Sequence, residues 1–105
     1  MKIAERKIFY KIFCKNHSTK IKIDITDIYR NTNETSYYLE YVSSCGRIKR
    51  HYDYSLSVYE KDGEFLVFLV FDLGFCADLC NARLIQFIKD EFGKVKKILY
   101  SFELN

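Results

Sequence analysis

Apolar residues alternate with polar ones along much of this chain, and this period of two constrains the fold more than any other feature. The clearest case is residues 21–26, where three isoleucines alternate with polar side chains. Segments 37–41, 48–59 and 98–104 show a similar alternation. Because successive side chains of a strand point to opposite faces, this pattern predicts half-buried β-strands.

Turn residues separate these segments. Gly46 and Asp62-Gly63 predict hairpin turns, since both sites supply residues that tolerate positive φ. The run 65–71 is apolar on both faces and predicts a central strand. Two interpretations stay open for residues 8–14, because their apolar side chains fit either alternate positions of a strand or one face of a helix.

Residues 75–92 instead show helical periodicity. At about 100° per residue, the apolar side chains between Ala77 and Phe92 fall within one half of a helical wheel. Gly93 follows where a left-handed residue often ends a helix. We therefore expect an α+β fold: a mostly antiparallel sheet of five to six strands, in the order β-β-β-β-β-α-β, packed on one amphipathic helix near residues 75–92. The length suits a single domain over residues 1–105.

The four cysteines are Cys14, Cys45, Cys76 and Cys80. Lysines interrupt the apolar residues of segment 1–14, so we expect no signal peptide there; with enough apolar residues for a core, we also expect reduced thiols. Cys76 and Cys80 lie on the apolar side of the predicted helix, where a free cysteine acts as a small core residue. Their spacing is not a zinc signature, so neither a metal site nor a cofactor is predicted.

Sequence motifs for catalysis are absent. His17 and His51 are the only histidines, and each stands in a polar stretch. The chain contains no Gly-rich phosphate loop and no nucleophile elbow, so we predict a non-enzymatic protein. The longest apolar run, residues 65–71, is too short to span a bilayer. We expect a cytoplasmic protein without membrane contact.

Basic residues outnumber acidic ones in residues 1–50, and the reverse holds in residues 51–105. In residues 46–54, basic side chains alternate with apolar and aromatic ones. That pattern is typical of phosphate contact combined with base stacking. One prediction is therefore a small nucleic-acid-binding protein that uses this basic and aromatic hairpin together with N-terminal lysines.

Tyrosines are concentrated in the same region, residues 37–54. Alternate tyrosines of a strand must face away from the core, and exposed Tyr and Arg are typical of protein interfaces. We favour a protein-binding module, of the inhibitor or immunity type encoded by phages and mobile elements, that occludes a partner protein. The predicted partner-binding residues are Tyr38, Tyr41, Arg47, Lys49, Arg50, His51 and Tyr52. An unpaired edge strand also allows a homodimer.

Overall fold

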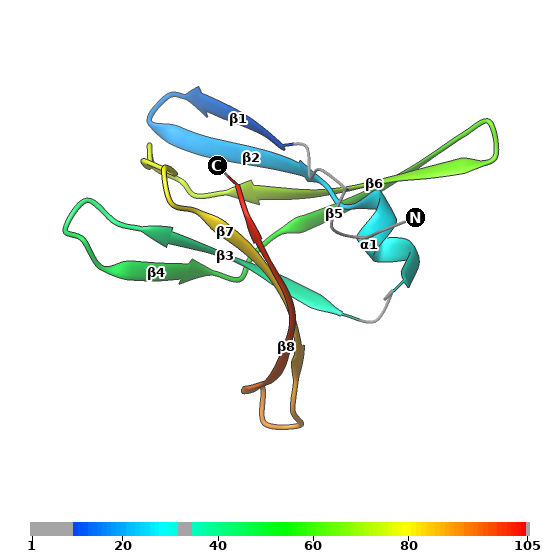
Figure 1. Ribbon diagram of the computed structural model, residues 1–105. Helices are drawn as coiled ribbons and strands as arrows, with labels where there is room; N and C mark the ends of the chain where they lie inside the picture. The colour runs from blue at the N-terminus through cyan, green and yellow to red at the C-terminus, as the bar shows by residue number, and fades with distance from the viewer. Residues whose placement is uncertain (1–9, 32–34, 105) are drawn as a thin grey trace.

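The computed structural model describes residues 10–31 and 35–104, which form two four-stranded antiparallel sheets (Figure 1). Sheet A has the order β1-β2-β6-β5 and consists of β1 (Tyr10–Lys15), β2 (Ser18–Asp24), β5 (Ser55–Lys61) and β6 (Glu64–Asp72). Sheet B has the order β4-β3-β7-β8 and consists of β3 (Ser36–Val42), β4 (Ile48–His51), β7 (Arg83–Lys89) and β8 (Val95–Glu103). The short helix α1 (Thr26–Asn31) follows β2.

Each sheet is assembled from two hairpins. Asn16 (φ 53°) and His17 (φ 65°) connect β1 to β2, and Asp62 (φ 52°) and Gly63 (φ 79°) connect β5 to β6. Two successive residues with positive φ match the right-handed twist of the flanking strands. The predicted hairpin at Asp62-Gly63 is therefore confirmed, as is the turn at Gly46 between β3 and β4.

The core lies between the two sheets and is formed by alternate residues of the inner strands. Each of the following side chains is at most 7% exposed: Ile21, Ile23, Val67, Leu69 and Phe71 of sheet A, and Tyr37, Leu39, Tyr41 and Leu84 of sheet B. Burying a large apolar side chain contributes about 1.5–3 kcal/mol. This double layer therefore supplies much of the stability, and the predicted strand in residues 21–26 is confirmed as β2 up to Asp24.

The segment between β6 and β7, residues 73–82, is a loop fastened to sheet A. The buried Thr19 accepts a hydrogen bond from the Ala77 N–H at its Oγ1 (2.9 Å) and donates its own N–H to the Phe75 carbonyl (2.9 Å). Cys14 of β1 forms a disulfide with Cys76 of the loop. The hydrogen bonds of Thr19 and this disulfide thus hold the loop beside the β1–β2 hairpin.

This arrangement corrects the expectation for the cysteines. Cys14 and Cys76 are bonded although 62 positions separate them, so the prediction of reduced thiols is wrong for this pair. Cys80 and Cys45 are free, and both are exposed. Neither Cys76 nor Cys80 belongs to the core, because the helix that was expected to carry them inward is absent from the described residues.

The expected α+β fold with a helix near residues 75–92 is wrong: the described chain is nearly all β, and α1 has only six residues. The stretch contains the loop, β7 and the turn into β8. Strand β7 is covered on both faces, with Leu84 and Gln86 toward the core and Ile85 and Phe87 buried on the outer face. A short run that is apolar on both faces fits a helical wheel as well as a strand. Pairing with β3 on one side and β8 on the other makes it a central strand.

The predicted strand over residues 48–59 is divided. Residues 48–51 form β4 of sheet B and residues 55–61 form β5 of sheet A, so the chain crosses between the sheets at residues 52–54. Tyr54 packs on the core near Phe71, with 5.7 Å between ring centroids. Tyr52 instead contacts the outer face of sheet B.

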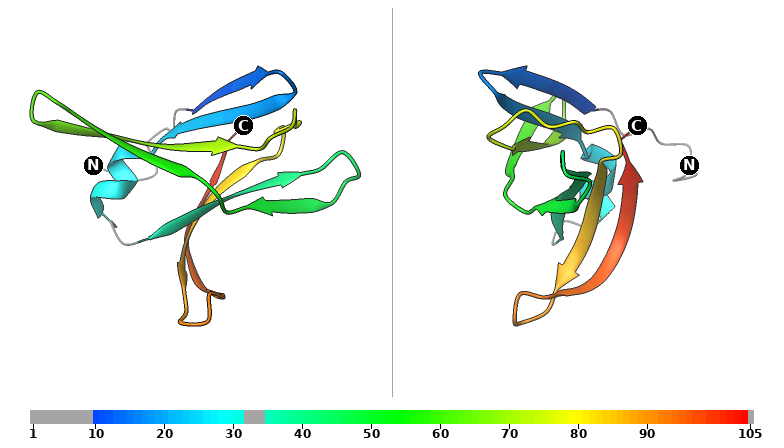
Figure 2. Two further views of the ribbon diagram at one scale, coloured as in Figure 1. Left: turned by 180° about the vertical axis from the view of Figure 1, so that it is seen from behind. Right: turned by 90° about the vertical axis from the view of Figure 1, so that its left-hand side faces the viewer.

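Two hairpins extend beyond the packed part of the sheets. Both views of Figure 2 show the β7–β8 turn projecting away from sheet A, and its left view shows the β5–β6 turn well beyond sheet B. No helix within the described ranges has the length and apolarity needed to cross a bilayer.

Candidate binding surfaces

The seven predicted binding residues lie on β3, on β4 or beside them, but they do not share one face. In the β3–β4 ladder, Lys49 is the register partner of Tyr41, and with His51 it takes the face toward sheet A. Arg50 is the register partner of Glu40 and takes the opposite, outer face. The alternation predicted for this strand is therefore present, and it divides the basic side chains between two environments.

Tyr38 and Tyr41 are buried, at 2% and 7% exposure. Tyr41 lies in the core, whereas Tyr38 faces away from the core, as the alternation predicts, and is covered there by Tyr52 and Phe87. Burial raises the pKa of the Tyr38 phenol. These two rings support the sheet and offer little area to a partner. Arg47 and Lys49 are exposed, whereas His51 is half-buried.

Tyr38, Tyr52 and Phe87 form an aromatic cluster on the outer face of sheet B. Their ring centroids are 5.0 Å, 5.1 Å and 6.0 Å apart, within the range of favourable aromatic pairs. The Arg50 guanidinium carbon lies 5.7 Å from the Tyr38 centroid, and Lys89 Nζ lies 5.4 Å from the centroids of both other rings. Within the cluster, Tyr52 is the exposed ring, at 40%. The structure therefore brings three predicted residues together with two that were not predicted.

Phe87 and Lys89 were missed because the sequence assigned them to a helix. As residues of a strand they alternate on one face, and the β7–β8 register places Ile98 opposite Phe87 and Val95 opposite Lys89. Both Val95 and Ile98 are exposed. We call the resulting area the outer B surface, formed by Arg50, Tyr52, Lys89, Val95 and Ile98.

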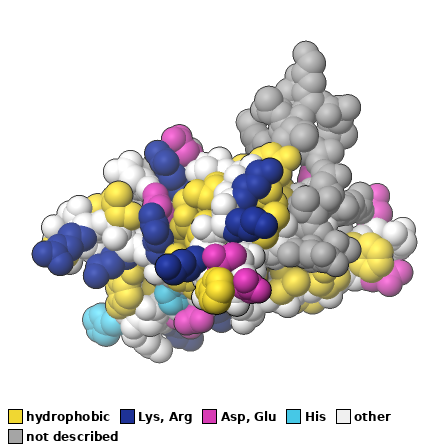
Figure 3. Space-filling model, turned by 90° about the horizontal axis from the view of Figure 1, so that it is seen from below, with side chains coloured by type: hydrophobic (Ala, Val, Ile, Leu, Met, Phe, Trp, Pro, Cys, Tyr) yellow, Lys and Arg dark blue, Asp and Glu magenta, His cyan; other side chains and the backbone are white. Residues whose placement is uncertain are grey.

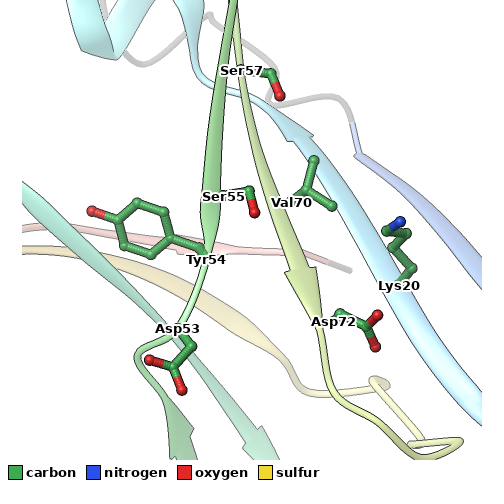
Figure 4. Close-up of a pocket in the computed structure, with 7 residues that line it drawn as sticks. All are labelled: Lys20, Asp53, Tyr54, Ser55, Ser57, Val70 and Asp72. Carbon is green, nitrogen blue, oxygen red and sulfur yellow. The ribbon is translucent and has the colours of Figure 1, made fainter.

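A shallow groove lies on sheet A beside the β4–β5 connection (Figure 4). It is lined by Lys20, Asp53, Tyr54, Ser55, Ser57, Val70 and Asp72. In Figure 4, Tyr54 points away from the other labelled side chains. Lys20 and Asp72 are register partners, and Asp53 is a second carboxylate in the lining, so the groove carries a formal charge of −1. No histidine lines the groove to activate its serine hydroxyls.

Lysines gather on the outer face of β1 and β2. Lys11 and Lys22 are direct register partners, and Lys15 and Lys20 share their face. Among the described residues, none of the four forms an ion pair within 4.0 Å. Like charges directly opposite each other destabilise a strand pair. Lys22 Nζ instead lies 4.1 Å above the Phe68 ring centroid, which is a close cation–π contact.

Cys45 is an exposed free thiol in the turn between β3 and β4. The Ser43 Oγ lies 3.1 Å from its Sγ, and this hydrogen bond is the main cause that lowers the pKa of the Cys45 thiol. Across the described residues, no three His, Cys, Asp or Glu side chains gather in a way that could hold a metal ion.

Comparison with known proteins adds no constraint. No protein-family model, no curated protein and no solved structure matches the chain. The chemistry of the surfaces described above is therefore the basis for interpreting function.

Proposed function

We propose that this protein is a small non-enzymatic module that binds a partner protein through the outer B surface. The observation that carries the proposal is the exposed Tyr52 ring, which packs against the buried Tyr38 and Phe87 rings. Lys89 Nζ lies 5.4 Å from the Tyr52 centroid, and Arg50 lies over the neighbouring Tyr38 ring. A ring held in place by its neighbours loses little conformational freedom on binding. Tyr and Arg are also the residue types whose truncation most often costs binding energy at interfaces.

The apolar side chains around Tyr52 support a protein partner. Ile98 is 51% exposed and Val95 is 39% exposed, and both lie beside Lys89 and Phe87 on the same face. Figure 3, a view from the side of the β7–β8 turn, shows Lys and Arg side chains interspersed with hydrophobic and acidic ones. A nucleic acid backbone favours a continuous basic track, which this mixture of side chains does not form. A module of this kind acts by occluding the surface that it covers, as inhibitor and immunity-type proteins do.

Affinity capture with matched variants tests the proposal. The bait is the full chain, and nuclease treatment before elution removes partners held through nucleic acid. Tyr52→Ala and Arg50→Ala should each reduce recovery of a captured protein about ten-fold, since hot-spot truncations cost about 1–2 kcal/mol or more. Tyr100→Ala is the control, because Tyr100 is also 40% exposed but is the register partner of the core residue Gln86, on the opposite face. Equal recovery with all variants would contradict the proposal.

The lysines of β1 and β2 favour a second candidate function, binding of a single-stranded nucleic acid on the outer face of sheet A. The paired Lys11 and Lys22 face no carboxylate within 4.0 Å among the described residues, and a phosphate would neutralise both. We expect the double variant Lys11→Ala/Lys22→Ala to lose affinity for a labelled oligonucleotide at low salt, measured by fluorescence anisotropy. Lys96→Ala/Lys97→Ala removes the same charge from β8 and should bind as the wild type does. If both double variants lose the same oligonucleotide affinity, the effect is one of overall charge, and the site on β1 and β2 is excluded.

A further inference from the structure

Strand β5 is an open edge of sheet A. It pairs with β6 on one side, and no described strand pairs with it on the other. Over the seven residues Ser55–Lys61, backbone N–H and C=O groups on the free side therefore have no strand partner. An edge of this length is a ready template for another strand.

The face of β5 directed toward sheet B is apolar and uncovered. Leu56 is 43% exposed and Val58 is 49% exposed, although their register partners on β6, Leu69 and Val67, are fully buried. Phe65, on the same face of β6, is 49% exposed. Figure 1 shows the reason, since the β5–β6 hairpin extends to one side while β3 and β4 extend to the other. This apolar face thus continues from the core to the edge of the sheet.

The other edges are better protected. Strand β4 has only four residues, with Lys49 and Arg50 at its centre. The β7–β8 ladder is interrupted by two register shifts, and β8 carries the adjacent Lys96 and Lys97. Strand β1 is joined by the Cys14 disulfide to the loop that follows β6. Short strands, bulges and lysines are the usual devices that prevent edge pairing, and the middle of β5 lacks them.

We infer that the free edge of β5 binds β5 of a second copy of this chain, antiparallel about a twofold axis at Ser57. In this register Leu56 of each copy lies opposite Val58 of the other, and Asp53 of each lies opposite Lys61 of the other. Every contact occurs twice, and the two sheets A become one continuous sheet of eight strands. The charge pairs flank the apolar pairs, so the edge is complementary to itself.

The register follows from the side chains. A twofold axis at Val58 would place Leu56 opposite Glu60 and would leave Asp53 without Lys61 as its partner. The axis at Ser57 is the one that aligns both the apolar pair and the opposite charges. The dimer leaves the outer B surface open, because that surface belongs to the other sheet. The dimer inference can therefore be correct or wrong independently of the proposed protein partner.

A charge exchange tests the inference on the full chain by sedimentation velocity across a range of concentrations. The wild type should show a concentration-dependent dimer. Asp53→Lys alone, or Lys61→Asp alone, places like charges opposite each other twice and should weaken dimerisation about ten-fold or more. The double variant Asp53→Lys/Lys61→Asp restores opposite charges and should recover the dimer. Lys96→Asp, an equal charge change on the β8 edge, should have no effect.

Two results would overturn the inference. One is a wild-type protein that stays monomeric at every concentration up to its solubility limit. The other is a dimer that the single variants leave unchanged or that the double variant fails to restore, because either outcome places the contact elsewhere. Circular dichroism of each variant confirms that the altered residues leave the fold intact; both are exposed, Lys61 at the end of β5 and Asp53 two residues before its start.

Discussion

Loss of the disulfide between Cys14 and Cys76 should destabilise the protein strongly. The bond closes a loop spanning 62 positions, which contains the five strands β2 to β6. Restricting an unfolded chain by a loop of this length lowers its entropy enough to stabilise the native state by about 4 kcal/mol. A small domain has only about 5–15 kcal/mol of stability in total. We therefore expect the disulfide to contribute a large share of the free energy of unfolding.

The assay compares thermal unfolding of oxidised and reduced protein in a background with Cys45→Ser and Cys80→Ser. Removing the two free thiols prevents disulfide exchange and leaves a single redox pair. For a chain of this size, a loss of about 4 kcal/mol corresponds to a fall in Tm of roughly 20 °C. Cys14→Ala/Cys76→Ala in the same background should match the reduced protein. Mass spectrometry after alkylation confirms the redox state of each sample.

The reasoning fails if oxidised and reduced samples unfold at the same temperature. It also fails if the protein purified under oxidising conditions alkylates at both Cys14 and Cys76, since the pair would then be unbonded in solution. A fall in Tm of only a few degrees would mean that the unfolded chain already keeps β1 close to the loop of residues 73–82.

Three further predictions concern a thiol, a turn and the core. At neutral pH the Cys45 thiol should alkylate faster than the Cys80 thiol, which is also exposed, and the Cys45 rate should fall when Ser43→Ala removes its hydrogen bond. Because the pKa of Cys45 is lowered, its rate advantage should shrink as the pH rises, and a ratio of rates that mass spectrometry finds independent of pH would contradict this. Gly63→Ala should cost about 1 kcal/mol of unfolding free energy from the positive φ of 79° alone, because nothing lies within 4 Å of an added Cβ; an unchanged Tm would refute it. Leu39→Ala, at a fully buried position between the sheets, should cost about 2–5 kcal/mol in denaturant titration, and a loss below 1 kcal/mol would show that the core collapses around it.

The strands that could be predicted are those in which one face is buried and the turn is local. Ile21 and Ile23 alternate with polar residues because β2 has the core on one side. Asp62 and Gly63 supply the positive φ values that a tight hairpin needs within their own dipeptide. Both signals are contained in a few adjacent residues, so a single sequence is enough to read them.

Strand β7 could not be recognised in this way because its environment is supplied by distant segments. A helical wheel of residues 75–92 puts Gln86 opposite the apolar half, yet the side chain is fully buried. Its Nε2 donates hydrogen bonds to Thr35 Oγ1 at 2.8 Å and to Tyr37 Oη at 3.3 Å. Thr35 lies directly before strand β3 and Tyr37 lies within it. Burying a side-chain amide without hydrogen-bond partners costs free energy, so Gln86 can be buried only where such partners exist. The tertiary structure alone brings those partners to it. The same limit hid the contact between Cys14 and Cys76.

The candidate site depends on residues 52–54, where the alternation predicts one continuous strand but the chain crosses from sheet B to sheet A. Residues 48–59 alternate as one strand would, which puts Tyr52 and Tyr54 on the same face. In the structure the chain changes sheets between them, so Tyr54 enters the core near Phe71 and Tyr52 joins Tyr38 on the outer face of sheet B. Both arrangements leave the alternation intact within β4 and within β5, which is why the pattern cannot distinguish them. Because of this crossing, Tyr52 lies on the outer face of sheet B, the same face as Arg50. An assay that separates Tyr52 from the equally exposed Tyr100 therefore tests the sheet crossing and the proposed function together.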